Sequence, residues 1–128
     1  MFNEAARKIF DDYYGFDDGL IKSFEYDFFQ ADALRVKIEM YARNYALEGD
    51  VWRTVRIIIE GVSEVRSVFE AGAFNVICSR VKLLRFDNAW CVEVDGDFGD
   101  IPISLDAIRK YSTCYVIGER VEVLELEG

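Results

Sequence analysis

Apolar side chains near the start of the chain recur at steps of three and four residues, which is the spacing of one helix face. They are Phe2, Ala5, Ala6, Ile9, Phe10 and Tyr13. Asn3 can cap the start of such a helix, and Gly15 suits the position just after its end. The spacing predicts a helix over about residues 3–14 whose apolar face covers a sheet.

Beyond Gly19 the apolar positions alternate with polar ones, which is typical of strands with one buried face. Residues 33–42 read A-L-R-V-K-I-E-M-Y-A, and the aromatic-rich segment 20–29 precedes them. The pattern predicts a hairpin of these two segments that turns near residues 30–32. It also predicts a third strand over residues 51–62.

The second half of the chain has weaker patterns. Residues 63–72 fit a short helix and an irregular strand equally well. Residues 75–86 and 89–94 are predicted to pair as strands around a turn at Asp87-Asn88. Alternation of Ile101, Ile103, Leu105 and Ala107 predicts a strand beginning around Pro102, with a helix over 106–111 as the rival interpretation. Residues 113–126 read as one broken strand or two short ones.

The expected fold class is α+β and mainly antiparallel β. We expect a β-sandwich or a half-open barrel with an N-terminal α-helix packed on the sheet. The chain has no internal repeat and no succession of β-α-β units, and its 128 residues suit a single domain over residues 1–128.

Composition narrows the function classes. The chain holds 24 acidic and 15 basic side chains, so its net charge of −9 disfavours nucleic acid and anionic membranes as partners. It has no histidine, which excludes serine–histidine and cysteine–histidine nucleophile pairs. Cys78, Cys91 and Cys114 lack C-x-x-C spacing and read as reduced core thiols. Residues 1–10 do not read as a signal peptide and no apolar run has the length of a membrane span, so we expect a cytoplasmic protein. We expect neither a cofactor nor a bound metal.

Two acidic clusters are candidate docking sites for a protein. Asp11, Asp12, Asp17 and Asp18 surround the end of the predicted helix, where carboxylates oppose the helix dipole. Asp95, Asp97 and Asp100 lie in a glycine-containing loop. This loop does not follow the calcium-binding EF-hand pattern, since Asp100 stands where that pattern needs glycine. The plain alternative for both clusters is solvated surface charge.

The segment G-F-D-D-G-L-I-K-S-F-E-Y-D at residues 15–27 resembles the opening of a family of small bacterial proteins. That family begins F-H-D-x-x-[IV], and Asp17 stands at the histidine position. The likeness continues through the alternating strand at 34–40 and the Gly61-Val62 pair, and it covers roughly residues 13–107. It implies a mostly antiparallel β fold and either an unknown role or toxin neutralisation. It offers no catalytic residue.

The leading hypothesis is therefore a non-enzymatic binding protein, of the kind of an immunity-type inhibitor, that docks a basic protein through acidic surface patches. The alternative is a carrier of a small apolar ligand, with a pocket inside a barrel or sandwich. A third class, an enzyme that uses carboxylates, would need a close pair of buried acids in a concave site. A long exposed edge strand would also allow a homodimer by sheet extension.

Overall fold

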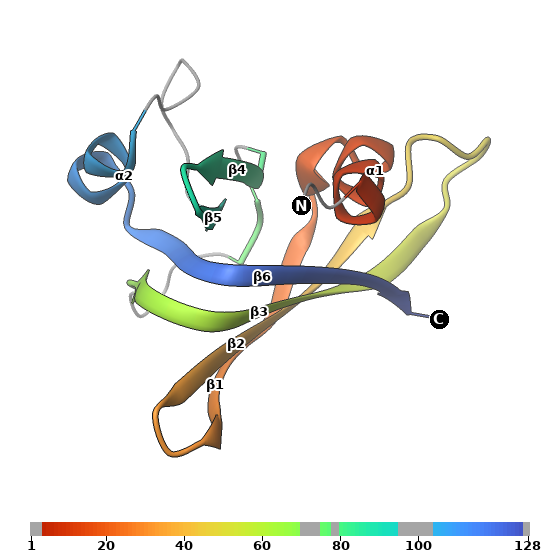
Figure 1. The fold of residues 1–128 in the computed structure, drawn as a ribbon. Coiled ribbons are helices and arrows are strands. Elements are labelled where there is room, and N and C mark those ends of the chain that lie inside the picture. Colours follow the sequence, from red (N-terminus) through yellow and green to blue (C-terminus); the bar gives the residue numbers. More distant parts are fainter. Residues whose placement is uncertain (1–3, 70–74, 78–79, 95–103, 127–128) are drawn as a thin grey trace.

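The computed structural model describes residues 4–69, 75–77, 80–94 and 104–126 (Figure 1). Its strands form one antiparallel six-stranded sheet in the order β1-β2-β3-β6-β5-β4. The strands are β1 (Leu20–Gln30), β2 (Ala33–Arg43), β3 (Trp52–Ser67), β4 (Lys82–Phe86), β5 (Ala89–Glu93) and β6 (Cys114–Leu126). The helices are α1 (Glu4–Asp12), the 3-10 turn η1 (Tyr14–Phe16) and α2 (Leu105–Tyr111). The sheet is not closed into a barrel, because β1 and β4 end it as edge strands.

The main core lies on the face of the sheet that carries α1, which we call the inner face. Alternate residues of β2 point toward this face, and their partners on the neighbouring strands do the same. One such set is Ile38 of β2, Ile57 of β3 and Val123 of β6, which lie side by side across the sheet. Ile38 and Ile57 are completely buried, and Val123 is 7% exposed. Because side chains alternate between the faces, the intervening residues are charged or half-buried on the outer face. The expected architecture, an antiparallel sheet with an N-terminal helix on it, is confirmed.

Helix α1 covers the inner face beside the β4–β5 hairpin, above the long strands β3 and β6 (Figure 1). Its apolar stripe buries Ala6 and Phe10, as the helical spacing predicts. Tyr13 follows the helix and is also completely buried, with its hydroxyl donating to a Glu125 carboxylate oxygen at 2.7 Å. Burial in the core and the neighbouring Glu125 charge raise the pKa of the Tyr13 phenol.

A smaller apolar cluster lies on the outer face, beneath α2. It contains Cys91, Tyr115 and Ile117 from the sheet and Ile108 from the helix. Helix α2 is the main correction to the sequence analysis, which favoured a strand through Leu105 and Ala107.

The segment folds as a helix because its end groups support one. The Ser104 side chain caps it by accepting from the Ala107 N–H at 3.1 Å, and Asp106 and Arg109 carry the charges that suit its two ends. Leu105 and Ile108, three residues apart, supply its apolar side, so the rival helix interpretation was right. Residues 101–103 lie outside the described part.

Three other segments were left open or were only partly predicted. For residues 63–72 a short helix and an irregular strand were both open, and residues 63–67 continue β3 as a strand. The pairing with β6 shifts between Val62 and Glu64, and this irregularity breaks the alternation that would mark a regular strand in the sequence. The paired strands predicted over 75–86 and 89–94 are present as β4 and β5, but β4 begins only at Lys82. Before it, Val76 forms a single bridge with Leu20. The final segment is one continuous strand, β6.

Candidate binding surface

The turn that follows α1 has an unusual backbone. Tyr14, Gly15 and Phe16 have φ angles of 51°, 61° and 60°, and Asp18 has 60°. The left-handed region costs a residue other than glycine roughly 1–2 kcal/mol, so such a run persists only where surrounding contacts enforce it.

Several contacts hold this turn in place. The Phe16 ring is completely buried and meets the Phe10 ring edge-on at 5.0 Å. The Gly15 carbonyl oxygen accepts from the Val81 N–H at 2.7 Å. The Phe16 carbonyl accepts from the Gly19 N–H at 2.9 Å. These contacts fix the turn to the core and to the segment before β4, so the side chains it displays have a defined position.

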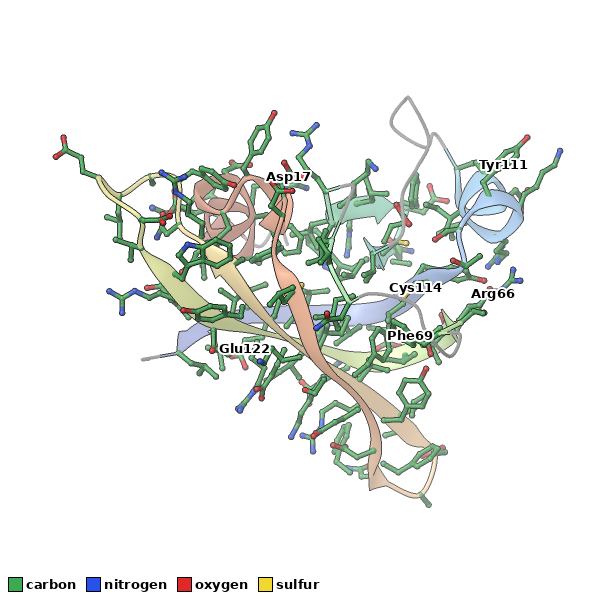
Figure 2. All side chains as sticks on the ribbon, turned by 180° about the vertical axis from the view of Figure 1, so that it is seen from behind. Asp17, Arg66, Phe69, Tyr111, Cys114 and Glu122 are labelled. Atoms are coloured by element: carbon green, nitrogen blue, oxygen red, sulfur yellow. The ribbon has the colours of Figure 1, made fainter. Side chains whose placement is uncertain are left out.

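The first predicted acidic cluster gathers around this turn. Asp11 and Asp18 are exposed and Asp17 is half-buried, and Figure 2 shows Asp17 beside the end of α1. Within the described part of the chain, the carboxylates of these three residues make no hydrogen bond or ion pair. Asp12 differs, since it accepts from Lys8 at 2.7 Å, and this contact raises the pKa of the lysine. The structure thus leaves three carboxylates without an ion-pair partner among the described residues, at this turn and at the helix end before it.

The second predicted acidic cluster, Asp95, Asp97 and Asp100, lies outside the described residues. Its role stays a prediction.

The structure adds two tyrosines to the surface that sequence reasoning missed. Tyr45, in the loop after β2, meets Tyr14 edge-on with 6.0 Å between ring centres. The guanidinium of Arg80 lies over the Tyr14 ring at 4.7 Å, and that of Arg43 over the Tyr45 ring at 5.0 Å. These four side chains form a row, the tyrosine row. No pattern along the chain connects positions 14, 45 and 80, because only the tertiary fold brings them together.

The loop that carries Tyr45 is tied to the acidic turn. The Tyr45 N–H donates to the Asp12 carbonyl at 2.8 Å, and the Tyr45 hydroxyl donates to the Asp17 carbonyl at 3.4 Å. Tyr14 is 53% exposed and Tyr45 is 42% exposed. Tyrosine and arginine are enriched at protein interfaces, and exposed carboxylates here form the rim around them. We call the tyrosine row together with Asp11, Asp17 and Asp18 the turn surface.

The outer face of the sheet has a different electrostatic character. Its charges pair across strands, with Arg35 to Asp27 at 2.9 Å and Arg56 to Glu39 at 2.8 Å. Arg120 also lies 3.7 Å from Glu60. Exposed pairs of this kind contribute little stability, but they leave this face with balanced charge. The turn surface holds three carboxylates without ion-pair partners in the described ranges and two arginines, of which Arg43 already pairs with Asp50 at 3.5 Å. It is therefore the better candidate for an acidic docking site.

One buried carboxylate stands apart from the turn surface. Glu93 is completely buried and accepts from the Ser112 hydroxyl at 2.7 Å, and the Lys82 ammonium lies 3.8 Å away. Among the described residues, Glu93 is the only buried acid, and its neighbours here are a lysine and a serine. The close pair of buried acids that the enzyme hypothesis requires is not present in this part of the chain.

The two described cysteines are buried thiols of the apolar clusters. Cys91 and Cys114 are buried, and burial together with the nearby Glu93 charge raises the pKa of Cys91 to about 12. Cys78 lies outside the described residues. No group of three or more cysteine, aspartate or glutamate side chains in the described ranges is arranged to hold a metal ion.

The carrier hypothesis expected a pocket enclosed by the strands. In the described part of the chain, the inner face is covered by α1 and holds fully buried side chains such as Met40, Val55 and Ile59. The carrier hypothesis stays an untested alternative. A cleft of about 440 Å³ lies at the surface, between α1 and β4.

Comparisons of this chain with family models, with curated proteins and with solved structures found no match. The likeness to the F-H-D proteins therefore stays a prediction that rests on the motif residues. In the described parts of the chain, neither α-helix has the length and apolar character needed to span a membrane.

Proposed function

We propose that this chain is a non-enzymatic binding protein that docks a basic protein on the turn surface. The observation that carries the proposal is that three unpaired carboxylates, Asp11, Asp17 and Asp18, flank a fixed turn whose exposed Tyr14 contacts the exposed Tyr45 of the loop after β2. The motif residues of the family resemblance, Phe16 to Asp18, lie in this same turn. That coincidence favours an immunity-type inhibitor, and we propose the cytoplasm as its place of action.

The charges and the aromatic rings would contribute in different ways. A net charge of −9 attracts a basic partner over long distances, and such steering raises association rates roughly 10–1,000-fold. Tyr14 and Tyr45 would bury apolar area in the complex and so lower the dissociation rate. Because the turn is already fixed by the core, little conformational entropy is lost when it binds.

The test compares three versions of the chain as immobilised baits in extracts of the source cells. The first is the native chain, and the second carries Asp11→Asn, Asp17→Asn and Asp18→Asn. The control carries Glu25→Gln in β1 and Glu119→Gln and Glu122→Gln in β6. It removes the same amount of charge from exposed positions outside the turn surface. Figure 2 shows Glu122 well away from Asp17.

We expect a basic protein to be retained by the native and control baits and lost from the asparagine bait. Its retention should fall as salt rises from about 50 to 500 mM, because screening weakens the attraction. Equal loss from both substituted baits would show that only net charge acts, and equal retention on all three would show that these carboxylates do not contribute. Either result would leave the turn surface without a specific role.

A homodimer through the edge strand β1 is less well supported. Tyr26 and Phe28 are 48% and 65% exposed on this strand, which makes it a candidate for sheet extension. However, an antiparallel pairing of two copies centred on Tyr26 would place Glu25 of one copy opposite Asp27 of the other. Like charges in that position destabilise the pairing. We therefore keep a basic protein, and not a second copy, as the proposed partner.

A further inference from the structure

The cleft between α1 and β4 carries charge of the opposite sign to the rest of the molecule. Helix α1 contributes Arg7, Phe10 and Asp11 to it, the turn contributes Tyr14, and the opposite wall contains Arg80 and β4. Its volume of about 440 Å³ lies within the usual range for small-molecule sites, roughly 300–1,000 Å³.

Two guanidinium groups reach this cleft from its two walls, and both are held by neighbours. Arg7 donates from Nη1 to the Leu83 carbonyl at 3.0 Å. Arg80 lies over the Tyr14 ring at 4.7 Å. Asp11 is the one carboxylate among the described residues that line the cleft. In a chain with 24 acids and 15 bases, two arginines facing one acid make a local site that favours an anion.

The backbone of β4 adds a donor to the same wall. The Val81 N–H and the Leu83 carbonyl both point away from β5, toward the turn and α1. The N–H and carbonyl of one strand residue point to the same edge, so the Leu83 N–H also faces the cleft. Charge-assisted hydrogen bonds from such donors to carboxylate or phosphate oxygens are among the stronger ones in proteins.

Apart from Lys82, the remaining lining of the cleft is apolar. The Phe10 ring is 5% exposed, the Val81 and Leu83 side chains are buried, and the Tyr14 ring is 53% exposed. An anion with no apolar part would leave these surfaces in water.

We propose that the α1–β4 cleft binds a small organic anion, with a phosphate or carboxylate group between Arg7 and Arg80 and an aromatic or apolar body against Tyr14. This proposal goes beyond the docking function and does not depend on it.

The test is a titration of the full chain by two-dimensional NMR of backbone amides. Phenyl phosphate and benzoate are the anionic probes, inorganic phosphate lacks the apolar body, and phenol lacks the charge. We expect phenyl phosphate to shift the amides of the turn and of β4, and to bind more tightly than inorganic phosphate or phenol. Binding of phenol with equal affinity would overturn the proposal, and so would the absence of saturable shifts with either anionic probe.

Two variants locate the site. Arg80→Gln should weaken binding of phenyl phosphate at least about tenfold, since it removes charge-assisted hydrogen bonds to the phosphate group. Arg85→Gln is the matched control, because Arg85 is also exposed and also lies over an aromatic ring, that of Trp90 at 4.9 Å, but does not line the cleft. Equal losses in the two variants would show nonspecific attraction to surface arginines and would contradict the proposal.

Asp11→Asn separates this proposal from the docking function. Removing the carboxylate from the cleft should strengthen binding of phenyl phosphate several-fold, since a nearby negative charge repels the probe. The same change should weaken docking of a basic protein. If Asp11→Asn weakens phenyl phosphate binding, the assignment of the anion to this cleft is wrong.

Discussion

Gly15 is the position where the structure predicts the largest effect of adding one methyl group. The substitution Gly15→Ala adds a Cβ atom to a residue with φ +61° in the middle of the left-handed turn. That atom would lie 2.6 Å from Arg80 Cβ and 3.0 Å from the Val81 carbonyl oxygen. Neither neighbour is the flexible end of a side chain, so the turn or the segment before β4 must move.

The expected cost has two parts. Left-handed strain costs alanine about 1–2 kcal/mol more than glycine. Overpacking against a fixed neighbour typically costs a further 1–3 kcal/mol or so. We therefore expect Gly15→Ala to lower the free energy of unfolding by about 2–5 kcal/mol. For a chain of 128 residues, each kcal/mol lowers the melting temperature by about 4 °C, so the fall should be roughly 8–20 °C.

Gly49→Ala is the matched control. Gly49 has φ +85°, but an added Cβ would meet no atom within 4 Å. It should therefore show the strain alone, about 1–2 kcal/mol. Urea unfolding of the native chain and of the two variants, followed by tryptophan fluorescence, measures the difference directly. If Gly15→Ala costs no more than Gly49→Ala, the close packing of the turn against Arg80 is refuted, and the rigidity of the turn surface with it.

Three further predictions concern the outer face beneath α2. Ser112→Ala removes the hydroxyl that donates to the completely buried Glu93 carboxylate, and urea unfolding should show a loss of about 1.5–3 kcal/mol; a loss below about 0.5 kcal/mol would contradict this account of the bond. The hydrogen bond from the Tyr115 hydroxyl holds the pKa of Glu64 below its usual 4.5, so Glu64 binds a proton more weakly in the folded chain than in the unfolded chain. The ionised Glu64 therefore stabilises the fold above about pH 4.5, and this stabilisation is lost as the pH falls. In Tyr115→Phe, the midpoint of urea unfolding should fall less between about pH 6 and pH 3 than it does in the native chain. An equal fall in both would argue that Tyr115 does not lower the pKa of Glu64. In a Cys78→Ser background, iodoacetamide at pH 8 should leave Cys91 unmodified in the folded chain but not in urea, because its pKa is raised to about 12; rapid labelling of the folded chain would contradict its burial.

The parts of the fold that the sequence predicted well are those with a regular local period. Helix α1 and the β1–β2 hairpin follow directly from apolar spacing, since each buries one face against the same core. The irregular parts of β3 and the helix α2 were harder to predict. In β3, the shift between Val62 and Glu64 breaks the alternation within a single strand. In α2, seven residues give too few turns for an apolar stripe to be distinguished from strand alternation.

The candidate site was only half predictable from the sequence. The cluster of Asp11, Asp17 and Asp18 is visible as a local concentration of acids. Its partnership with Tyr45 and Arg80 depends on contacts between segments that are tens of residues apart. The cleft was also missed, because Arg7 and Arg80 become neighbours only when β4 is placed next to α1.

The strand order has a consequence for how the chain reaches this structure. β6 follows the other five strands in sequence, yet it lies between β3 and β5, and it pairs Thr54 with Leu126. Until β6 has left the ribosome, β1–β2–β3 and the β4–β5 hairpin have no common strand to join them, and the edge of β3 stays open to other chains. Completing the sheet during synthesis must therefore wait for residue 126, and a nascent chain halted before β6 would be prone to aggregate.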